Sequence, residues 1–174
     1  MAGVTTALVR ATQTITLDDA GEATDGETIV IGSKTYTFRA TVGALDGSVH
    51  IGATVADTVA NLIAAINLDA TLGETGSGAG TDYGTAMTRN PDCYATAVAA
   101  TGVITLYAHV PGSIGNHIVL GQGTSTITLG AATFASGTGI VGDFFDELLA
   151  SVQLNSEAIM HLRPFSAVEG GKLD

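Results

Sequence analysis

The side chains that most often hold a metal ion or move protons in proteins, histidine and cysteine, are few in this chain. Its histidines are His50, His109, His117 and His161, and its one cysteine is Cys93. A helical zinc site needs two histidines four residues apart, and none of the four has such a partner. His109 and His117 flank an expected turn and could converge. With no cysteine or acidic residue at matching spacing, the sequence predicts no metal site.

Carboxylates gather at two places, Asp18 with Asp19, and Asp143 with Asp146 and Glu147. Two carboxylates that face each other across a cleft, about 5–9 Å apart, can hydrolyse a glycosidic bond. The sequence leaves that arrangement open. A solvated turn for the first group, and the acidic first turn of a helix for the second, explain both more simply.

Two further motifs resemble functional ones only in part. The stretch GSGAG at 76–80 lacks the Gly-Lys-Ser/Thr of a Walker loop, and it lacks the preceding strand and following helix of a dinucleotide loop. Cys93 stands beside Tyr94 on an expected strand, so we interpret it as a small buried apolar side chain rather than a nucleophile. We therefore expect no catalytic, cofactor-binding or metal-binding residue, and no enzymatic activity.

Charge and composition narrow the range of partners. Six Lys and Arg residues face 17 Asp and Glu residues, for a net charge of −11 over 174 residues. Such a chain repels phosphate backbones and lacks the basic clusters that bind anionic membranes, so we expect neither nucleic acid nor membrane as a partner. A single cysteine excludes an internal disulfide and fits folding in a reducing cytoplasm. We find no signal peptide and no membrane-spanning run.

Alternating apolar residues predict a series of short strands. The first lies at 12–17, after an arm at 1–11, and the segment 26–38 reads as a hairpin. Gly32 and Ser33 form its corner, which suits a primed turn because glycine accepts a positive φ without cost. Further strands are expected at 47–51, at 93–99 and 103–109 as a second hairpin, and within 118–134.

An apolar stripe at helical spacing predicts one main helix at about 54–68. Thr54 is its expected N-cap, and Asp57 makes its first turn acidic. Because an apolar stripe must be covered, this helix should lie across a sheet, with Leu62 in the core. The stripe consists of Val55, Val59, Leu62, Ile63 and Ile66.

The remaining segments are a long loop and the two ends of the chain. The loop at 71–92 is rich in Gly, Thr and Asp, and structureless loops of this length are uncommon inside a domain. We expect a neighbouring subunit to order it. A second helix is expected at 142–154 and a last strand at 157–165. The polar ends, 1–11 and 166–174, are expected to include an arm that reaches another subunit.

These elements predict a β-rich α+β fold. Hairpins and short antiparallel strands form a sheet or sandwich, with the helix at about 54–68 packed on it and a second helix near the C-terminus. We divide the chain into an N-terminal arm and first strand at 1–20, a core at 21–140, and a C-terminal helix, strand and tail at 141–174.

The order of several sequence blocks carries a family resemblance. The succession DGETIVIGSKTYTF, HIGATVADTVANLIAAIN, GSGAGTDYGT, NPDCYATA and ITLYAHVPGSIGNHIVL, over about residues 25–135, resembles a module of structural proteins of tailed bacteriophages, including tail, fibre and head-surface proteins. The resemblance implies a virion component without catalytic residues. The segments outside it, 1–20 and 140–174, would determine its position in the virion.

Within that family, we expect a capsid decoration or cement protein that stabilises the head shell. The partners implied are further copies of the chain, as a homotrimer, and the major capsid protein or other virion subunits, assembled in the host bacterial cytoplasm. A neck, tail or baseplate component remains an alternative, as does a carbohydrate-binding module of a fibre. Sugar sites favour aromatic platforms, and four Tyr, five Phe and no Trp argue against the last.

Overall fold

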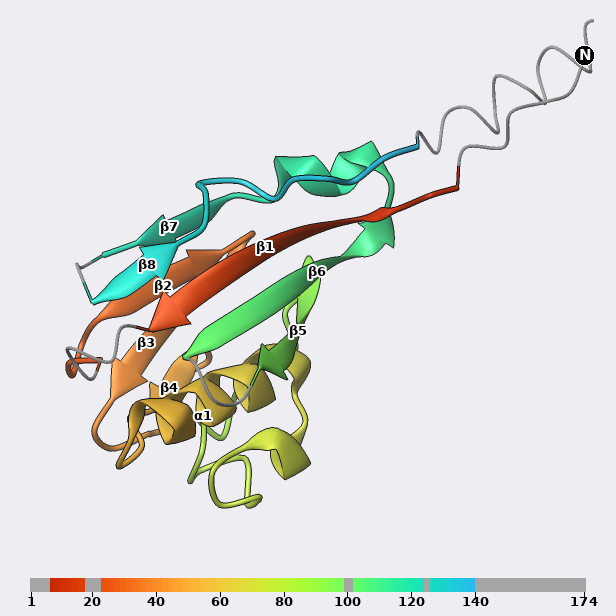
Figure 1. Cartoon of the computed structure of the whole chain (residues 1–174). Helices are drawn as coiled ribbons and strands as arrows, with labels where there is room; N and C mark the ends of the chain where they lie inside the picture. The colour runs from red at the N-terminus through yellow and green to blue at the C-terminus, as the bar shows by residue number, and fades with distance from the viewer. Residues whose placement is uncertain (1–6, 18–22, 99–101, 124–125, 140–174) are drawn as a thin grey trace, which may run out of the picture. The chain divides into compact units, whose positions relative to one another are not determined.

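Eight short strands and one α-helix make up the described part of a computed structural model of the chain (Figure 1). The structure describes residues 7–17, 23–98, 102–123 and 126–139. Contacts divide the chain into two units, Met1–Gly139 and Ile140–Asp174, and every described residue belongs to the first. The predicted helix at 142–154 and strand at 157–165 lie outside the described residues.

The described strands form two four-stranded sheets, which confirms the β-rich α+β class. The first sheet has the order β5 (Cys93–Val98), β6 (Val103–Pro111), β1 (Arg10–Leu17) and β8 (Ile127–Leu129). The second has the order β4 (Ser48–His50), β3 (Lys34–Arg39), β2 (Thr28–Ile31) and β7 (Leu120–Gln122).

One strand pair departs from the antiparallel arrangement that the sequence predicts. β3 and β4 are parallel, with Thr37 opposite Ser48 and Arg39 opposite His50. The loop at 40–47 carries the chain back along β3 before β4 begins, so the two strands run in the same direction. The other named pairs are antiparallel, including both predicted hairpins, β2–β3 and β5–β6.

The β2–β3 hairpin turns where the sequence predicts. Gly32 has a φ of +62°, and a side chain there would overlap the Asp92 carboxylate. That carboxylate accepts hydrogen bonds from the Ser33 backbone N–H at 2.7 Å and from the Ser33 hydroxyl at 2.8 Å. The turn is therefore fixed by glycine conformation and by one acidic side chain from the start of the other hairpin.

A short stretch near residue 133 joins the two sheets. Thr133 forms an antiparallel β-bridge with Val119, next to β7, and Ala135 forms one with Thr12 in β1. The stretch thereby links the edge of the second sheet next to β7 with β1 of the first sheet. The strands β5 and β4 remain as the two ends of the linked sheets, and α1 contacts both of them.

The predicted main helix is confirmed as α1, Val55–Asn67. The Thr54 side chain caps it by accepting a hydrogen bond from the Asp57 N–H at 3.2 Å. Val59, Leu62 and Ile63 of the predicted stripe are buried, as is Ile66, while Val55 is only partly buried. The stripe joins one core with the inner sheet faces, whose largest buried side chains are Tyr36, Phe38, Phe134, Ile15, Ile29, Ile31, Ile104, Leu106 and Ile127.

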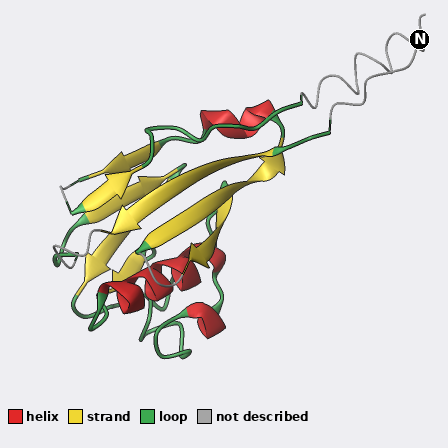
Figure 2. Cartoon of the chain, in the orientation of Figure 1, coloured by secondary structure: helices red, strands yellow, loops and turns green. Residues whose placement is uncertain are grey.

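Short 3₁₀ helices lie at the two ends of the sheets (Figure 2). η1 (Ala70–Leu72) lies at the same end as α1, and η2 (Ser113–His117) lies at the opposite end, where the sequence predicts only a turn. At the η2 end, Val9 bridges Thr138 and β1 begins at Arg10. The predicted arm at 1–11 is thus too long, because its last two residues pair within the sheet.

Candidate interaction surface

His109 and His117, the two histidines that the sequence places on either side of a turn, both lie near the η2 end. The Nε2 atom of His109 lies 3.2 Å from the Asn90 carbonyl oxygen, and His117 is the last residue of η2. Within the described residues, no group of three His, Cys, Asp or Glu side chains is arranged to hold a metal ion. His161 lies outside the described residues.

The one cysteine lies in the core. Cys93 is fully buried in β5, and burial, followed by the nearby charge of Asp92, raises the pKa of its thiol to about 12. A thiol with so high a pKa is a poor nucleophile. The acidic groups at 18–19 and 143–147 lie outside the described residues. None of the helices in the described part is long and apolar enough to cross a membrane.

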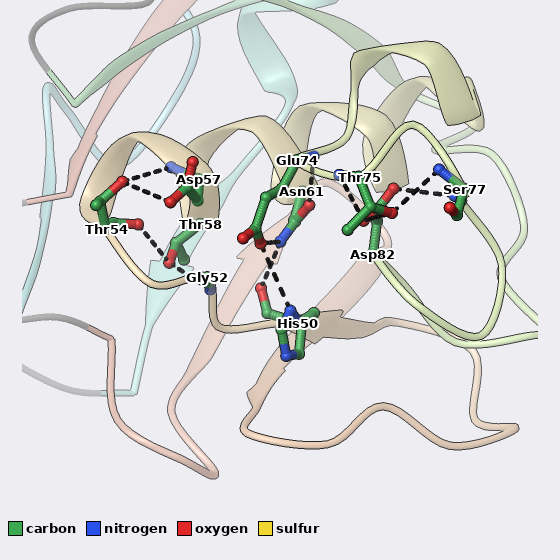
Figure 3. A network of polar contacts seen from close by, with 11 residues as sticks. His50, Gly52, Thr54, Asp57, Thr58, Asn61, Glu74, Thr75, Ser77 and Asp82 are labelled. Atoms are coloured by element: carbon green, nitrogen blue, oxygen red, sulfur yellow. Dashed lines mark hydrogen bonds and ion pairs between the residues drawn. The ribbon is translucent and has the colours of Figure 1, made fainter.

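The Asp82 carboxylate organises the long loop that follows α1 (Figure 3). Asp82 is fully buried. It accepts hydrogen bonds from the Thr75 hydroxyl at 2.8 Å, the Thr75 N–H at 3.1 Å and the Gly78 N–H at 2.9 Å. One side chain thereby satisfies several backbone donors of a loop that has no strand partner for them.

These donors also change the acidity of Asp82. Burial alone would raise the pKa of its carboxyl, but hydrogen bonds from Gly78, Thr75 and the Ser77 backbone lower it overall. The charged form is the one that the loop binds. Asp82 is thus a structural anion held by the chain's own amides.

A second set of contacts ties the loop to α1 and β4. The Asn61 amide donates to the His50 carbonyl and to the Glu74 carboxylate, each at 3.2 Å, and its oxygen accepts the Glu74 N–H at 2.9 Å. The His50 Nδ1 lies 3.7 Å from Glu74 Oε2. Asn61 is fully buried, so its amide groups need these partners.

The loop at 71–92 is therefore held by its own chain. Beyond the Asp82 and Asn61 contacts, Tyr83 bridges Val49 and the Asp82 carbonyl accepts the His50 N–H at 3.0 Å. The prediction that a neighbouring subunit must order this loop is wrong for this part of it, because the composition showed the polar groups but not their partners.

Lys34 fixes the far end of the same loop. Its ammonium lies 2.7 Å from the Asp46 carboxylate and also donates to the Thr88 carbonyl. Burial alone would raise the pKa of Asp46, but hydrogen bonds from Lys34 and Thr88 and the charge of Lys34 lower it to about 2. This rare basic residue serves the fold of β3 rather than a ligand.

Asparagine side chains pair with backbone as a neighbouring strand would. Asn67, the last residue of α1, donates to the Ala95 carbonyl at 2.8 Å and accepts the Ala95 N–H at 2.9 Å. Asn116 makes the same two bonds with Gly137, at 3.0 and 2.9 Å. At the start of β5, Asn90 accepts the Cys93 N–H at 3.1 Å. The outer side of β5 is thus covered at two positions.

An aromatic pair stands on the outer face of the first sheet. The Tyr94 and Tyr107 rings are stacked, with centroids 5.3 Å apart and an interplanar angle of 13°. The Arg10 guanidinium carbon lies 6.0 Å from the centroid of Tyr94, and the His109 ring lies 5.8 Å away. A sugar platform needs a free ring face, and here the two tyrosines cover one face of each other.

The η2 end carries the clearest exposed apolar surface. We define the η2 patch as Val110, Ile114 and Val119, whose side chains are 50%, 59% and 53% exposed. Ile114 lines two neighbouring hollows, one together with Val119 and the other together with Val110. The larger hollow measures about 430 Å³, and its lining also includes Ser33, Asp92, His117 and Ile118.

The patch lies where the described chain begins and ends. Leu8 and Val9, two more exposed aliphatic residues, lie beside it, since the Val9 carbonyl accepts the Gly112 N–H at 2.9 Å. The Gly139 carbonyl accepts the Ser113 N–H, also at 2.9 Å. Among the described residues, five of the eight exposed large apolar side chains are therefore at this end.

Sequence analysis missed both the asparagine pairings and the η2 patch. One local signal was available for the first, because Asn-Pro-Asp at 90–92 is typical of a turn in which the asparagine bonds nearby amides. No local signal marked the patch. Val110, Ile114 and Val119 have the composition of ordinary core residues, and only the fold shows that nothing described covers them.

Comparisons with known proteins add no relative. Neither protein-family models nor curated proteins give a match to the chain.

Proposed function

We propose that this chain is a structural subunit of a bacteriophage virion, and in the first place a capsid decoration or cement protein. The observation that carries the proposal is the η2 patch, because exposed aliphatic side chains around a hollow are typical of surfaces that other protein subunits cover. The family resemblance of residues 25–135 supplies the kind of assembly.

The use of the polar side chains supports this reading. Asp82, Asp46 and Asp92 accept hydrogen bonds from the chain's own loops, and the one thiol is buried. These groups stabilise a β-rich body with fixed loops. Such a body suits a subunit that must present a constant surface to its neighbours.

The proposed partners are other copies of the chain, as a trimer, and the major capsid protein. Trimers match the local threefold positions of a capsid lattice. A neck, tail or baseplate position is the alternative within the same class, and the η2 patch suits it equally. The stacked Tyr94 and Tyr107 rings do not favour a carbohydrate-binding module.

The experiment that tests the proposal is a density map of tailed-phage particles whose genome encodes the chain. We expect the β-rich body of residues 7–139 to fit density on the outer surface of the head. Density for this body at the neck or tail would contradict a decoration protein and support a neck, tail or baseplate component instead. Absence of the chain from purified particles, measured by mass spectrometry, would contradict a virion role.

A further inference from the structure

We propose that the Glu74 carboxylate is a strap poised to close on the His50 ring, and that it fixes which ring nitrogen of His50 carries the proton. The inference is independent of the proposed function, and it needs no ligand or partner. It rests on one atom that the contacts described above leave unused, the Nδ1 of His50.

This nitrogen is buried and has no hydrogen bond. Among the side chains that the structure describes, His50 Nδ1 is the only buried nitrogen or oxygen without a partner. Such an atom is costly, because it has lost its hydrogen bonds to water and gained none in return. Glu74 Oε2 lies 3.7 Å away, just beyond hydrogen-bonding distance. A shift of roughly 0.7 Å would bring the two atoms to the usual separation of about 3.0 Å.

The carboxylate determines which tautomer the His50 ring can adopt. In a neutral imidazole one nitrogen donates its N–H and the other accepts. If Nδ1 were the acceptor, its lone pair would face the negatively charged Glu74 oxygen, and the two acceptors would repel each other. The proton therefore belongs on Nδ1, in the neutral ring and in the doubly protonated ring alike. Nε2 is left as the acceptor of the neutral ring, and Figure 3 shows this second nitrogen pointing away from Glu74.

The charged groups that β3 and α1 place near His50 are already paired. Arg39 stands opposite His50 in the β3–β4 pair, but its guanidinium lies 3.6 Å from the Asp25 carboxylate. On α1, the Asp57 carboxylate accepts the Thr54 hydroxyl at 2.8 Å. The acceptor that remains for Nδ1 is the carboxylate of the loop.

Glu74 is held in position for this contact by Asn61. The Glu74 N–H donates to the Asn61 side-chain oxygen at 2.9 Å, and the Asn61 amide donates to Glu74 Oε2 and to the His50 carbonyl, each at 3.2 Å. The side chains of His50 and Glu74 are only 31% and 25% exposed, so water competes weakly for the contact. A closed Glu74–His50 bond completes a ring of contacts that joins β4, α1 and the loop.

The test is the tautomer of His50, measured by nitrogen NMR of the imidazole ring in the full chain. The measurement is made at about pH 9, well above the range in which imidazoles usually titrate. In the wild type, Nδ1 should be protonated and Nε2 unprotonated, the reverse of the form that prevails in a histidine side chain without a partner. His50→Gln identifies the signals, because they disappear in that variant.

Two variants separate the contact from the general effect of a nearby acid. Glu74→Ala should change the ratio of the two tautomers at least about tenfold toward the Nε2–H form, as expected for the loss of one hydrogen bond to a charged group. The matched control is Asp57→Ala, which removes a neighbouring carboxylate of the same charge and should leave the ratio unchanged. Circular dichroism shows whether each variant folds.

Two results would overturn the inference. One is a wild-type His50 whose proton lies on Nε2, and this result does not depend on the folding of any variant. The other is a control variant, Asp57→Ala, that changes the ratio as strongly as Glu74→Ala does. Neither result bears on whether the chain is part of a virion, so the inference and the proposed function fail separately.

Discussion

The α1 end and the η2 end of the domain differ in which side chains are buried: polar ones are buried at the α1 end, and apolar ones are exposed at the η2 end. At the α1 end, Asp82 and Asn61 are fully buried, and their polar atoms bond to the loop around them. At the η2 end, Val110, Ile114 and Val119 are at least half exposed, over a hollow. The α1 end is complete within one chain, whereas the η2 end leaves apolar surface for something else to cover.

The difference teaches where the stability of the molecule and its contacts with partners should be sought. Substitutions at the α1 end should change the free energy of unfolding and leave association alone. Substitutions in the η2 patch should do the reverse. The following predictions test this division, from the largest expected effect on folding to the smallest.

Leu62→Asp should abolish folding. Leu62 is fully buried on the inner face of α1, and an unpaired carboxylate there has no partner, so the loss should exceed about 4 kcal/mol. We expect no soluble protein, measured as yield after lysis. Ala56→Asp is the control, because Ala56 is exposed in the first turn of the same helix, where the dipole favours an acid. Normal yield and melting of Leu62→Asp would show that the core is placed wrongly.

Asp82→Asn should destabilise the fold by about 2–4 kcal/mol, because an amide group must then face backbone donors that need an acceptor. Chemical unfolding followed by circular dichroism measures this. Asp25→Asn is the control: Asp25 is an exposed acid 3.6 Å from Arg39, and such pairs contribute about 1 kcal/mol or less. Equal losses for the two variants would mean that the Asp82 contacts do not hold the loop.

Acid should destabilise the loop contacts that Asp82 and Asp46 make. The pKa values of Asp82 and Asp46 are lower in the folded chain than the usual value for an unfolded aspartate, about 3.9. Their stabilisation is therefore complete above that value and is lost as the pH falls through the folded pKa values, toward about 2 for Asp46. Unfolding free energy measured from pH 6 to pH 2 should fall with pH. The double variant Asp46→Asn, Asp82→Asn should show a shallower fall, and an unchanged slope would contradict this assignment.

Asn67→Asp tests the asparagine that covers β5. The substitution keeps the acceptor for the Ala95 N–H but replaces the donor with an oxygen that faces the Ala95 carbonyl. We expect a loss of about 1–3 kcal/mol in unfolding free energy. Hydrogen exchange of the Ala95 amide should accelerate with it. An unchanged exchange rate at Ala95 would show that the pairing is not maintained in solution.

Ile114→Ser should leave the unfolding free energy of the monomer within about 0.5 kcal/mol of the wild type, since Ile114 is 59% exposed. The measurement is chemical unfolding at a concentration low enough to keep the chain monomeric. A loss like that of a core residue would break the comparison, because the η2 patch would then be part of the fold.

Sequence reasoning found the elements whose signals are local. The stripe from Val59 to Ile66 predicted α1, and alternation predicted both hairpins, because a buried face imposes a period on the residues that form it. The parallel pairing of β3 with β4 could not be predicted from the sequence, because the direction of the 40–47 loop depends on contacts distant in sequence. The partners of Asp82 were hidden for the same reason.

The interaction surface was less predictable than the fold. Val110 and Ile114 look like strand and turn residues of any core. Ile114 is exposed because η2 packs on β1 and β6 through its other side. Gly115 makes that packing close, because a Cβ there would meet Ala108 and Ala11. A sequence shows which side chains are apolar, but only the completed fold shows which of them remain uncovered.

The coverage of the two outer strands limits how copies of this chain can join. Asn67 and Asn90 occupy positions beside β5 that a further strand would need, and the backbone near Tyr83 does the same for β4. A second molecule therefore cannot readily lengthen either sheet by hydrogen bonding to its edge. Even at high concentration, copies of the chain should therefore not grow into fibres by adding strand to strand at β5 or β4.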